Sequence, residues 1–296
     1  SPVSGIIQNI ERGPKRKIEK IIIESSGIQD SIKHFVSDWE KKNRENLKLL
    51  LAESGNWPFI HQRPYGIMAN PTDTPKAIFV STVKTDPLHG DVQFILKDQK
   101  NDFQLGIDLL NKLVDQPVFL GVEKIFSDYF GSIEGVQHYT VQGPHPAGNL
   151  SLHIQKLCPL NMGELIWTVN AEDVANLGRF IRSGIFCSRR TIAISGNAVE
   201  HPKYFQTNIG ADLQPFLKKV GTIKEKIRVI NGDVLTGETS FARPFLGYFN
   251  NLVSIIPEGD KYRMFGWLPF IDNNILSLSN TSLSRIFNRK GFDVDT

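Results

Sequence analysis

Several residue types and patterns that point to a function class are scarce in this sequence. Its 296 residues include only two cysteines, Cys158 and Cys187, which are too few for a disulfide framework and favour a reducing compartment. We interpret both as small apolar core residues rather than as a redox pair. Lys and Arg number 34 against 31 Asp and Glu, for a net charge of +3. This balance, without a dense basic stripe, argues against a nucleic-acid partner.

Long apolar runs are also missing. The run Leu252-Val253-Ser254-Ile255-Ile256 is far below the roughly 20 apolar residues that a membrane-spanning helix needs. We therefore expect no transmembrane segment, and no signal peptide is visible. The sequence begins with Ser1-Pro2-Val3, without Met, and runs directly into strand-like residues. We expect a trimmed fragment whose first domain lacks its front half.

The common catalytic motifs do not occur. The sequence has no phosphate-cradling Gly-x-x-x-x-Gly-Lys-Ser/Thr loop, no Gly-x-Gly-x-x-Gly after a predicted strand and no Gly-x-Ser-x-Gly elbow. It also lacks Cys-x-x-Cys and His-Glu-x-x-His. Its carboxylates are scattered, and spacing alone does not pair them. The sequence therefore offers no candidate catalytic residue.

The first 55 residues predict two strands followed by helices. Ile6, Ile7 and Ile10, and then the run Ile18–Ile23, predict two short strands on either side of a basic turn at 12–16. Two strands alone bury little, so these need partners. Apolar residues at helical spacing predict mostly helix over 28–55, with a second helix that is capped by Asn43 and ends at Gly55.

Residues 76–196 alternate between strand-like and helix-like segments. This order predicts an open α/β sheet with crossover helices. The expected strands are Ala77–Val83, Val118–Val122, Val136–Val141, Leu165–Val169 and Thr191–Ile194, and the expected helices are Asp102–Val114 and Ala171–Ile181.

The pattern changes after about residue 195. Glycines and prolines punctuate short strand-like pieces, Leu213–Val220 predicts a short amphipathic helix, and Asn231-Gly232 signals a tight turn. We predict a small β-rich domain with one helix near residues 190–265. The tail from Tyr262 to Phe287 predicts further strand-like pieces and a helix start at Leu283.

One loop is a candidate binding or docking site. The residues in question are Gly143, Pro144, His145, Pro146 and Gly148, followed by His153. They come after a predicted strand, and ligands of open α/β sheets lie at strand carboxyl ends. A rigid connection between strand and helix explains the same residues, and both interpretations stay open. A metal site at His145 and His153 lacks a third ligand, so we predict no metal.

A second segment, Trp57–Tyr65, combines three aromatic rings, two prolines and an arginine. Trp57, Arg63 and Tyr65 would suit a quinone or flavin ring, although packing of the aromatic rings into the core is the favoured interpretation. Asp86-Pro87-Leu88-His89-Gly90 ends the first long strand and would line the same edge. We predict that Arg189-Arg190 is a surface pair.

Together these segments resemble the NqrA family, the A subunits of the sodium-translocating NADH:quinone oxidoreductase. The loop Gly143–Gly148 with His153 resembles that family's GPHPAG…H stretch, and Glu53–Pro58 with Arg63-Pro64-Tyr65 resembles its S-G-x-W…R-P-F/Y segment. Three further stretches match in order, so the resemblance covers essentially the whole chain; they are Ala77–Val80, Arg228–Gly237 and Phe265–Trp267.

The resemblance implies a multi-domain α/β (α+β) fold. Residues 1–25 would be the remnant of a barrel-sandwich domain, 26–55 a helical linker, 56–190 a Rossmann-like domain similar to the flavin subunit of respiratory complex I, 191–262 a ligand-binding-like β-grasp (SLBB-like) domain, and 263–296 a C-terminal extension. It also implies a peripheral subunit on the cytoplasmic side of the bacterial inner membrane. Its expected partners are the other subunits of the complex, chiefly the membrane-embedded B subunit, and ubiquinone.

The residues depart from the flavin-binding relative at one place. Where that relative has several closely spaced glycines, this chain has Ser54-Gly55-Asn56-Trp57-Pro58-Phe59, which cannot wrap a phosphate. A four-cysteine iron–sulfur pattern is missing too. We therefore expect no cofactor in this subunit, with FAD, FMN, riboflavin and iron–sulfur centres in its partners. A flavin- or NADH-binding dehydrogenase and a stand-alone ligand-binding module are the alternatives.

Overall fold

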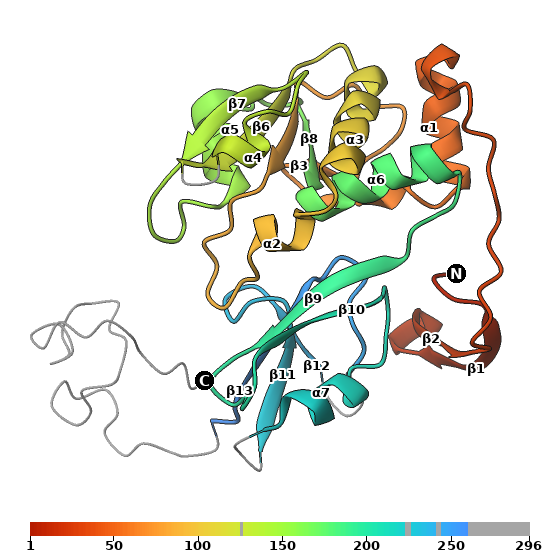
Figure 1. Ribbon diagram of the computed structural model, residues 1–296, viewed down its shortest axis with the longest axis vertical. Coiled ribbons are helices and arrows are strands. Elements are labelled where there is room, and N and C mark those ends of the chain that lie inside the picture. The colour runs from red at the N-terminus through yellow and green to blue at the C-terminus, as the bar shows by residue number, and fades with distance from the viewer. Residues whose placement is uncertain (125–126, 223–225, 241–243, 260–296) are drawn as a thin grey trace, which may run out of the picture. The chain divides into compact units, whose positions relative to one another are not determined.

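The computed structural model describes residues 1–124, 127–222, 226–240 and 244–259 (Figure 1). These residues form two compact units. The first comprises Ser1–Arg190 and Thr207–Ile209, and the second begins with Thr191–Gln206 and continues from Gly210. The sequence prediction of a mixed α/β fold with several sheets is confirmed. No helix among the described residues is long and apolar enough to cross a membrane.

A two-stranded antiparallel sheet opens the chain. Strands β1 (Gly5–Arg12) and β2 (Ile18–Ser25) are joined through the turn η1 (Pro14–Arg16), in which Lys15 and Arg16 have positive φ angles of 56° and 60°. The predicted strands and basic turn are confirmed. The isoleucines of both strands are largely exposed. That these residues are the remnant of a barrel-sandwich domain stays a prediction.

The predicted helix over the first part of 28–55 is wrong. Residues 28–42 form only a bridge between Lys33 and Ile185 and the short turn η2 (Trp39–Lys41). The segment runs extended because its backbone pairs with the chain after a helix rather than with itself. The second helix is confirmed as α1 (Arg44–Glu53), where Asn43 Oδ1 accepts from the Asn46 amide at 2.8 Å. Gly55 follows it with a φ of 79°.

Six strands of the first unit's described residues form an open sheet in the order β4-β3-β8-β5-β6-β7. Strands β8, β5, β6 and β7 are parallel, whereas β3 is antiparallel to β8 and β4 to β3. This confirms the predicted open α/β sheet, except that the expected strand Thr191–Ile194 belongs to a second sheet, where it forms part of β9 (Arg189–Ser195). The strands are β3 (Ile60–Arg63), β4 (Ile67–Met68), β5 (Ile78–Ser81), β6 (Val118–Glu123), β7 (Gln137–Val141) and β8 (Ile166–Asn170).

Helices cover both faces of this sheet. Along β5, Ile78 and Val80 join the larger core with α1, α3 and α6, whereas Phe79 packs toward α5 (Figure 1). This alternation follows from the period of two in a strand. The other helical elements are η3 (Trp57–Phe59), α2 (Val92–Leu96), α3 (Lys100–Leu113), α4 (Ser127–Phe130), α5 (Leu150–Leu157) and α6 (Ala171–Ser183).

Helices α3 and α6 approach closely through glycines. A Cβ built at Gly178 of α6 would lie 1.7 Å from the Asp102 carbonyl oxygen, and one at Gly106 of α3 would lie 2.0 Å from the Val174 carbonyl oxygen. Any other residue at either position would push the helices apart. At this crossing the Asp102 carboxylate accepts hydrogen bonds from Arg182 Nε and Nη2 at 2.8 and 3.1 Å.

The prediction that Arg189-Arg190 is a surface pair is wrong for Arg190. Its side chain is 1% exposed, and its Nη1 lies 2.6 Å from Asp173 Oδ1 and 3.6 Å from Glu172 Oε2. The guanidinium also lies over the Phe59 ring, 5.4 Å from its centroid. Two buried carboxylates in the first turn of α6 need a buried cation, which Arg190 supplies. Arg189 is exposed as predicted.

The described part of the second unit is the predicted β-rich domain. Its strands follow the order β10-β9-β13-β11-β12, and they enclose a core that includes Ile194, Leu213 and Ile255. The elements are β9 (Arg189–Ser195), β10 (Lys203–Asn208), α7 (Gln214–Val220), β11 (Ile227–Asn231), β12 (Glu238–Ser240) and β13 (Leu252–Pro257). The predicted turn follows β11, where Gly232 has a φ of 104°. The elements predicted over 262–287, and the extension 263–296, lie outside the described residues.

Candidate functional site

Two loops meet at the carboxyl ends of the parallel strands. Strand β5 ends at Ser81 and is followed by residues 82–91, and β7 ends at Val141 and is followed by residues 142–149. The Gly148 amide donates a hydrogen bond to Thr85 Oγ1 at 2.9 Å, and a Cβ at Gly148 would lie 2.8 Å from the Thr85 nitrogen. The glycine is therefore required for this close approach.

His145 strengthens the contact between these loops. Its Nδ1 lies 3.3 Å from Thr85 Oγ1 and 3.6 Å from Asp86 Oδ1. Asp86 is thus brought to the 143–148 loop. Its sequence position after β5 gave a signal for this placement. Nothing in the sequence marked Thr85 as the residue that accepts from the Gly148 amide and contacts His145.

His153 connects the loop to strand β7 through hydrogen bonds. Its Nε2 lies 2.7 Å from the Ala147 carbonyl oxygen and its Nδ1 lies 2.9 Å from the Tyr139 hydroxyl. Because a carbonyl only accepts, Nε2 carries the proton and donates, and Nδ1 accepts from the tyrosine. Burial lowers the pKa of His153 and raises the pKa of Tyr139, so both groups stay neutral at pH 7.

This arrangement leaves His153 no nitrogen for a metal. The described residues contain no group of three or more His, Cys, Asp or Glu that would hold an ion. His153 is therefore a support for the loop, a role that the sequence spacing did not distinguish from ligand binding.

The loop has a fixed inner side and an open rim. The Ala147 amide donates to the Pro144 carbonyl and the Asn149 amide to the Pro146 carbonyl, both at 2.8 Å. Gly143 has a φ of 134°, which glycine adopts more readily than other residues. Gln142, Gly143, Pro144 and Pro146 are exposed. This part of the molecule offers a shaped, prefixed backbone surface.

The structure separates the three residues of the candidate quinone site. Trp57 is 3% exposed, its Nε1 donates to the Ala69 carbonyl at 2.7 Å, and its ring meets Trp167 edge-on at 5.5 Å between centroids. Tyr65 is 76% exposed, in the turn between β3 and β4. Core packing, the favoured interpretation, is confirmed for Trp57 and for Phe59, which is also buried.

The register of β3 places Arg63 and Asp86 at opposite edges of the sheet. Arg63 pairs with Ile166, the first residue of β8, whereas Ile60 pairs with Val169 near its end. Arg63 and the following Tyr65 therefore lie at the amino ends of the parallel strands. Asp86 follows the carboxyl end of β5, so the expectation that both segments line one edge is wrong. Because β3 is antiparallel to its neighbour β8, the carboxyl end of β3 lies beside the amino end of β8.

The fold and the site define the class of this protein: an α/β domain with a preformed loop at its strand ends, followed by a small β-rich domain. Residues 42–186 match the family model described as the NqrA second alpha/beta domain, and residues 191–241 match the NQRA C-terminal domain. The chain belongs to the NqrA family, the A subunits of the Na⁺-translocating NADH-quinone reductase. The resemblance noted in the sequence is thereby confirmed.

Curated relatives share one name, that of the A subunit of the Na⁺-translocating NADH-quinone reductase. The chain is 34% identical to the protein of this name from Rhodopirellula baltica over 272 residues, which cover 90% of the chain and 60% of that protein. For the proteins of the same name from Vibrio atlanticus and Yersinia pestis, the identities are 31% and 32%, with 100% of the chain and 66% of each relative covered. The chain thus spans 60% to 66% of the length of these relatives.

Solved structures give a more distant likeness. An NAD⁺-reducing [NiFe]-hydrogenase in the H₂-reduced state matches with a TM-score of 0.49 and 10% identity, covering 78% of this chain and 52% of that chain. At this similarity no functional conclusion follows.

Proposed function

We propose that this chain is the peripheral, cytoplasmic NqrA component of a complex that couples NADH oxidation by ubiquinone to sodium export, and that it docks on the membrane-embedded B subunit. The relatives' shared name supports membership. The observation that carries the docking role is the loop 143–148, whose inner side is tied to Thr85 and His153 while its rim is exposed. A prefixed surface loses little conformational entropy when it binds a partner.

We further propose that this component holds no cofactor and contributes through assembly. The segment that replaces the glycine-rich flavin loop packs into the core. Ser54 and Asn56 are buried, and the Asn56 side-chain Nδ2 donates to Ser54 Oγ at 2.9 Å. The Trp57 indole fills the space beside it. The backbone amides of Ser54, Gly55, Asn56 and Phe59 already donate to carbonyl oxygens of α1 or of the segment itself. Because a phosphate needs free amides, this favours a scaffold over a dehydrogenase.

The quinone contact is proposed for Arg63 and Tyr65, with Trp57 in support. Tyr65 offers an exposed ring. The Arg63 guanidinium lies near the same turn, because its Nη1 is 3.8 Å from the position that a Cβ would take at Gly66. Trp57 holds the strand that follows this turn through its bond to Ala69. An exposed ring beside a cation suits the face and the carbonyl oxygens of a quinone.

Affinity capture from detergent-solubilised membranes tests the docking role. The full-length protein serves as bait, as wild type, as Pro144→Arg and as the matched control Met162→Arg, which changes another exposed loop residue. We expect wild type and the control to recover flavin-bearing membrane subunits with sodium-stimulated NADH:quinone activity, and Pro144→Arg to recover much less. If wild type recovers nothing under conditions that preserve the complex, the proposal that this protein is a component of the complex would be overturned. Equal recovery by all three would overturn the loop's role alone.

A further inference from the structure

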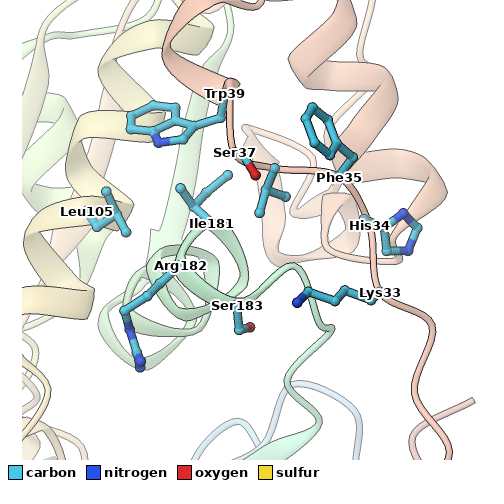
Figure 2. A pocket seen from close by; sticks show the side chains of 10 residues that line it. Lys33, His34, Phe35, Ser37, Trp39, Leu105, Ile181, Arg182 and Ser183 are labelled. Atoms are coloured by element: carbon cyan, nitrogen blue, oxygen red, sulfur yellow. The ribbon is translucent and has the colours of Figure 1, made fainter.

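A groove of about 590 Å³ lies where an extended segment crosses the end of helix α6 (Figure 2). One side comes from residues 33–37 and Trp39, and the other from Leu105 of α3 with Ile181, Arg182 and Ser183 at the end of α6. None of the lining residues belongs to the 143–148 loop, and α6 leads away from the carboxyl end of β8 before it reaches the groove with its last turn. The groove is therefore a separate surface.

The groove is preformed. The His34 amide donates to the Gly184 carbonyl at 2.8 Å, and the His34 ring packs edge-on against Phe180 at 5.9 Å. Gly184 has a φ of 73°, and a Cβ there would lie 2.4 Å from the His34 carbonyl oxygen. The extended segment is thus fixed against the helix end by backbone contacts that a side chain at Gly184 would prevent.

The lining combines an apolar floor with aromatic walls. Its apolar floor is formed by the lining residues Val36 and Ile181, which are buried, whereas the lining residue Phe35 is 67% exposed. Ile32, next to the groove in sequence, is 80% exposed. Solvent-exposed aromatic and aliphatic side chains beside a cavity mark an interaction surface more than a finished core.

The charge at this groove is mainly positive. No carboxylate is among its lining residues, and Lys33 reaches across it toward Ser183 (Figure 2). Two more ammonium groups lie over its walls, Lys42 at 5.8 Å from the Phe35 ring and Lys112 at 5.9 Å from the Trp39 ring.

Acidic side chains also lie on the elements that form the groove. Asp38 and Glu40, on the same segment, are exposed. Arg182 is held by Asp102, so Lys33, Lys42 and Lys112 supply the available charge.

We propose that this groove docks a short acidic segment of a partner protein, which places an apolar side chain on the Val36–Ile181 floor and carboxylates beside the lysines. The apolar side chains that line the groove select an apolar anchor, and its lysines select the sign of the flanking charge. This goes beyond the proposed function, because it names a second surface and the chemistry of its partner.

Fluorescence anisotropy with synthetic peptides tests the proposal on the full chain. The probe is a labelled peptide of about 12 residues in which pairs of Leu alternate with Glu; matched peptides carry Gln or Lys in place of Glu. The groove variant is K33E with F35S, and the control variant is K97E with F94S. The control pair likewise combines a lysine with an exposed phenylalanine, but beside α2 and away from the groove: Lys97 lies 4.9 Å from the centroid of the Phe94 ring. Both variants change exposed residues, so circular dichroism is expected to report an intact fold.

We expect the acidic peptide to bind about tenfold more tightly than the Gln and Lys peptides, and to weaken at about 0.5 M salt. The groove variant should lose this binding and the control variant should keep it. A photoreactive Leu analogue in the peptide should crosslink to residues 33–39 or 181–183. Equal binding of all three peptides, binding that survives in the groove variant, or crosslinks elsewhere would each overturn the proposal. A longer form of the protein whose own additional residues crosslink to Phe35 would overturn it in favour of an intramolecular cover.

Discussion

Replacing Gly178 by Ala should separate helices α3 and α6. The added Cβ would lie 1.7 Å from the Asp102 carbonyl oxygen, 2.7 Å from its carbon and 2.8 Å from the Gly106 nitrogen. All three atoms are backbone, so no side-chain rotation relieves the contact. Ordinary van der Waals contact begins at about 3.4 Å, so the helices must move apart by about 1.7 Å.

Two opposing effects set the magnitude. Alanine favours a helix over glycine by about 1 kcal/mol. Against this, overpacking in a well-packed core costs about 1–3 kcal/mol, and here the separation also loosens Phe103, Ile107 and Leu177 in the main core and the Arg182–Asp102 pair. Because the clash is with backbone, we place the packing cost above the usual range. We expect a net loss of about 2–3 kcal/mol in the free energy of unfolding, or roughly 4–12 °C in Tm for a unit of this size.

Thermal and denaturant unfolding, followed by circular dichroism, measures this change. Asn101→Ala is the control, because it also introduces an alanine into this helix pair, at an exposed position of α3. We expect its free energy of unfolding to change by no more than about 0.5 kcal/mol. An unchanged or higher stability of Gly178→Ala would refute the close helix crossing, since the propensity gain would then act alone. The groove at the end of α6 should also lose peptide binding in this variant.

Three further perturbations test other parts of the structure. Arg190→Met should cost about 3–5 kcal/mol in denaturant unfolding, because it leaves Asp173 buried without its cation, whereas exposed Arg189→Met should have little effect. Burial lowers the pKa of His153 from its ordinary 6.5. Just below pH 6.5 the unfolded chain therefore binds more protons at this residue than the folded chain does, and the free energy of unfolding should fall as the pH falls from 6.5 toward the lower, folded-state pKa. Compared at pH 7.5 and 5.5, the stability of His153→Gln should change less than that of wild type, and an identical change would contradict this role. Arg63→Ala in the assembled enzyme should raise the quinone KM about tenfold, as the loss of a charged hydrogen bond implies, and unchanged quinone kinetics would remove Arg63 from the site.

The elements that sequence predicted well are those whose signal is local. The continuous apolar run at β5 and the Asn43 cap of α1 need no distant partner to be recognised. Residues 28–39 have helical spacing too, but the backbone of His34 pairs with Gly184, about 150 residues away. A tertiary contact of that kind leaves no periodic signal in the sequence.

The candidate site was predictable in its location but not in its chemistry. Gly143–Gly148 stands out by composition, and the open-sheet rule places it at the strand ends. The roles of Thr85 and Tyr139 depend on which loops and strands become neighbours, which the strand order alone decides. Arg190 was misplaced for a related reason: its partners Asp173 and Glu172 become buried only once α6 packs on the sheet.

The antiparallel strand β3 decides how the proposed contacts relate to one another. Because β3 is antiparallel to β8, Arg63 and Tyr65 lie at the amino ends of the parallel strands, whereas the 143–148 loop lies at their carboxyl ends. A strand of four or five residues spans about 13–17 Å, too far for one quinone head group to touch both. If the protein contributes to a quinone site through Arg63, its docking through the loop must therefore be a separate contact. Substitutions at the two places should then add in free energy rather than couple.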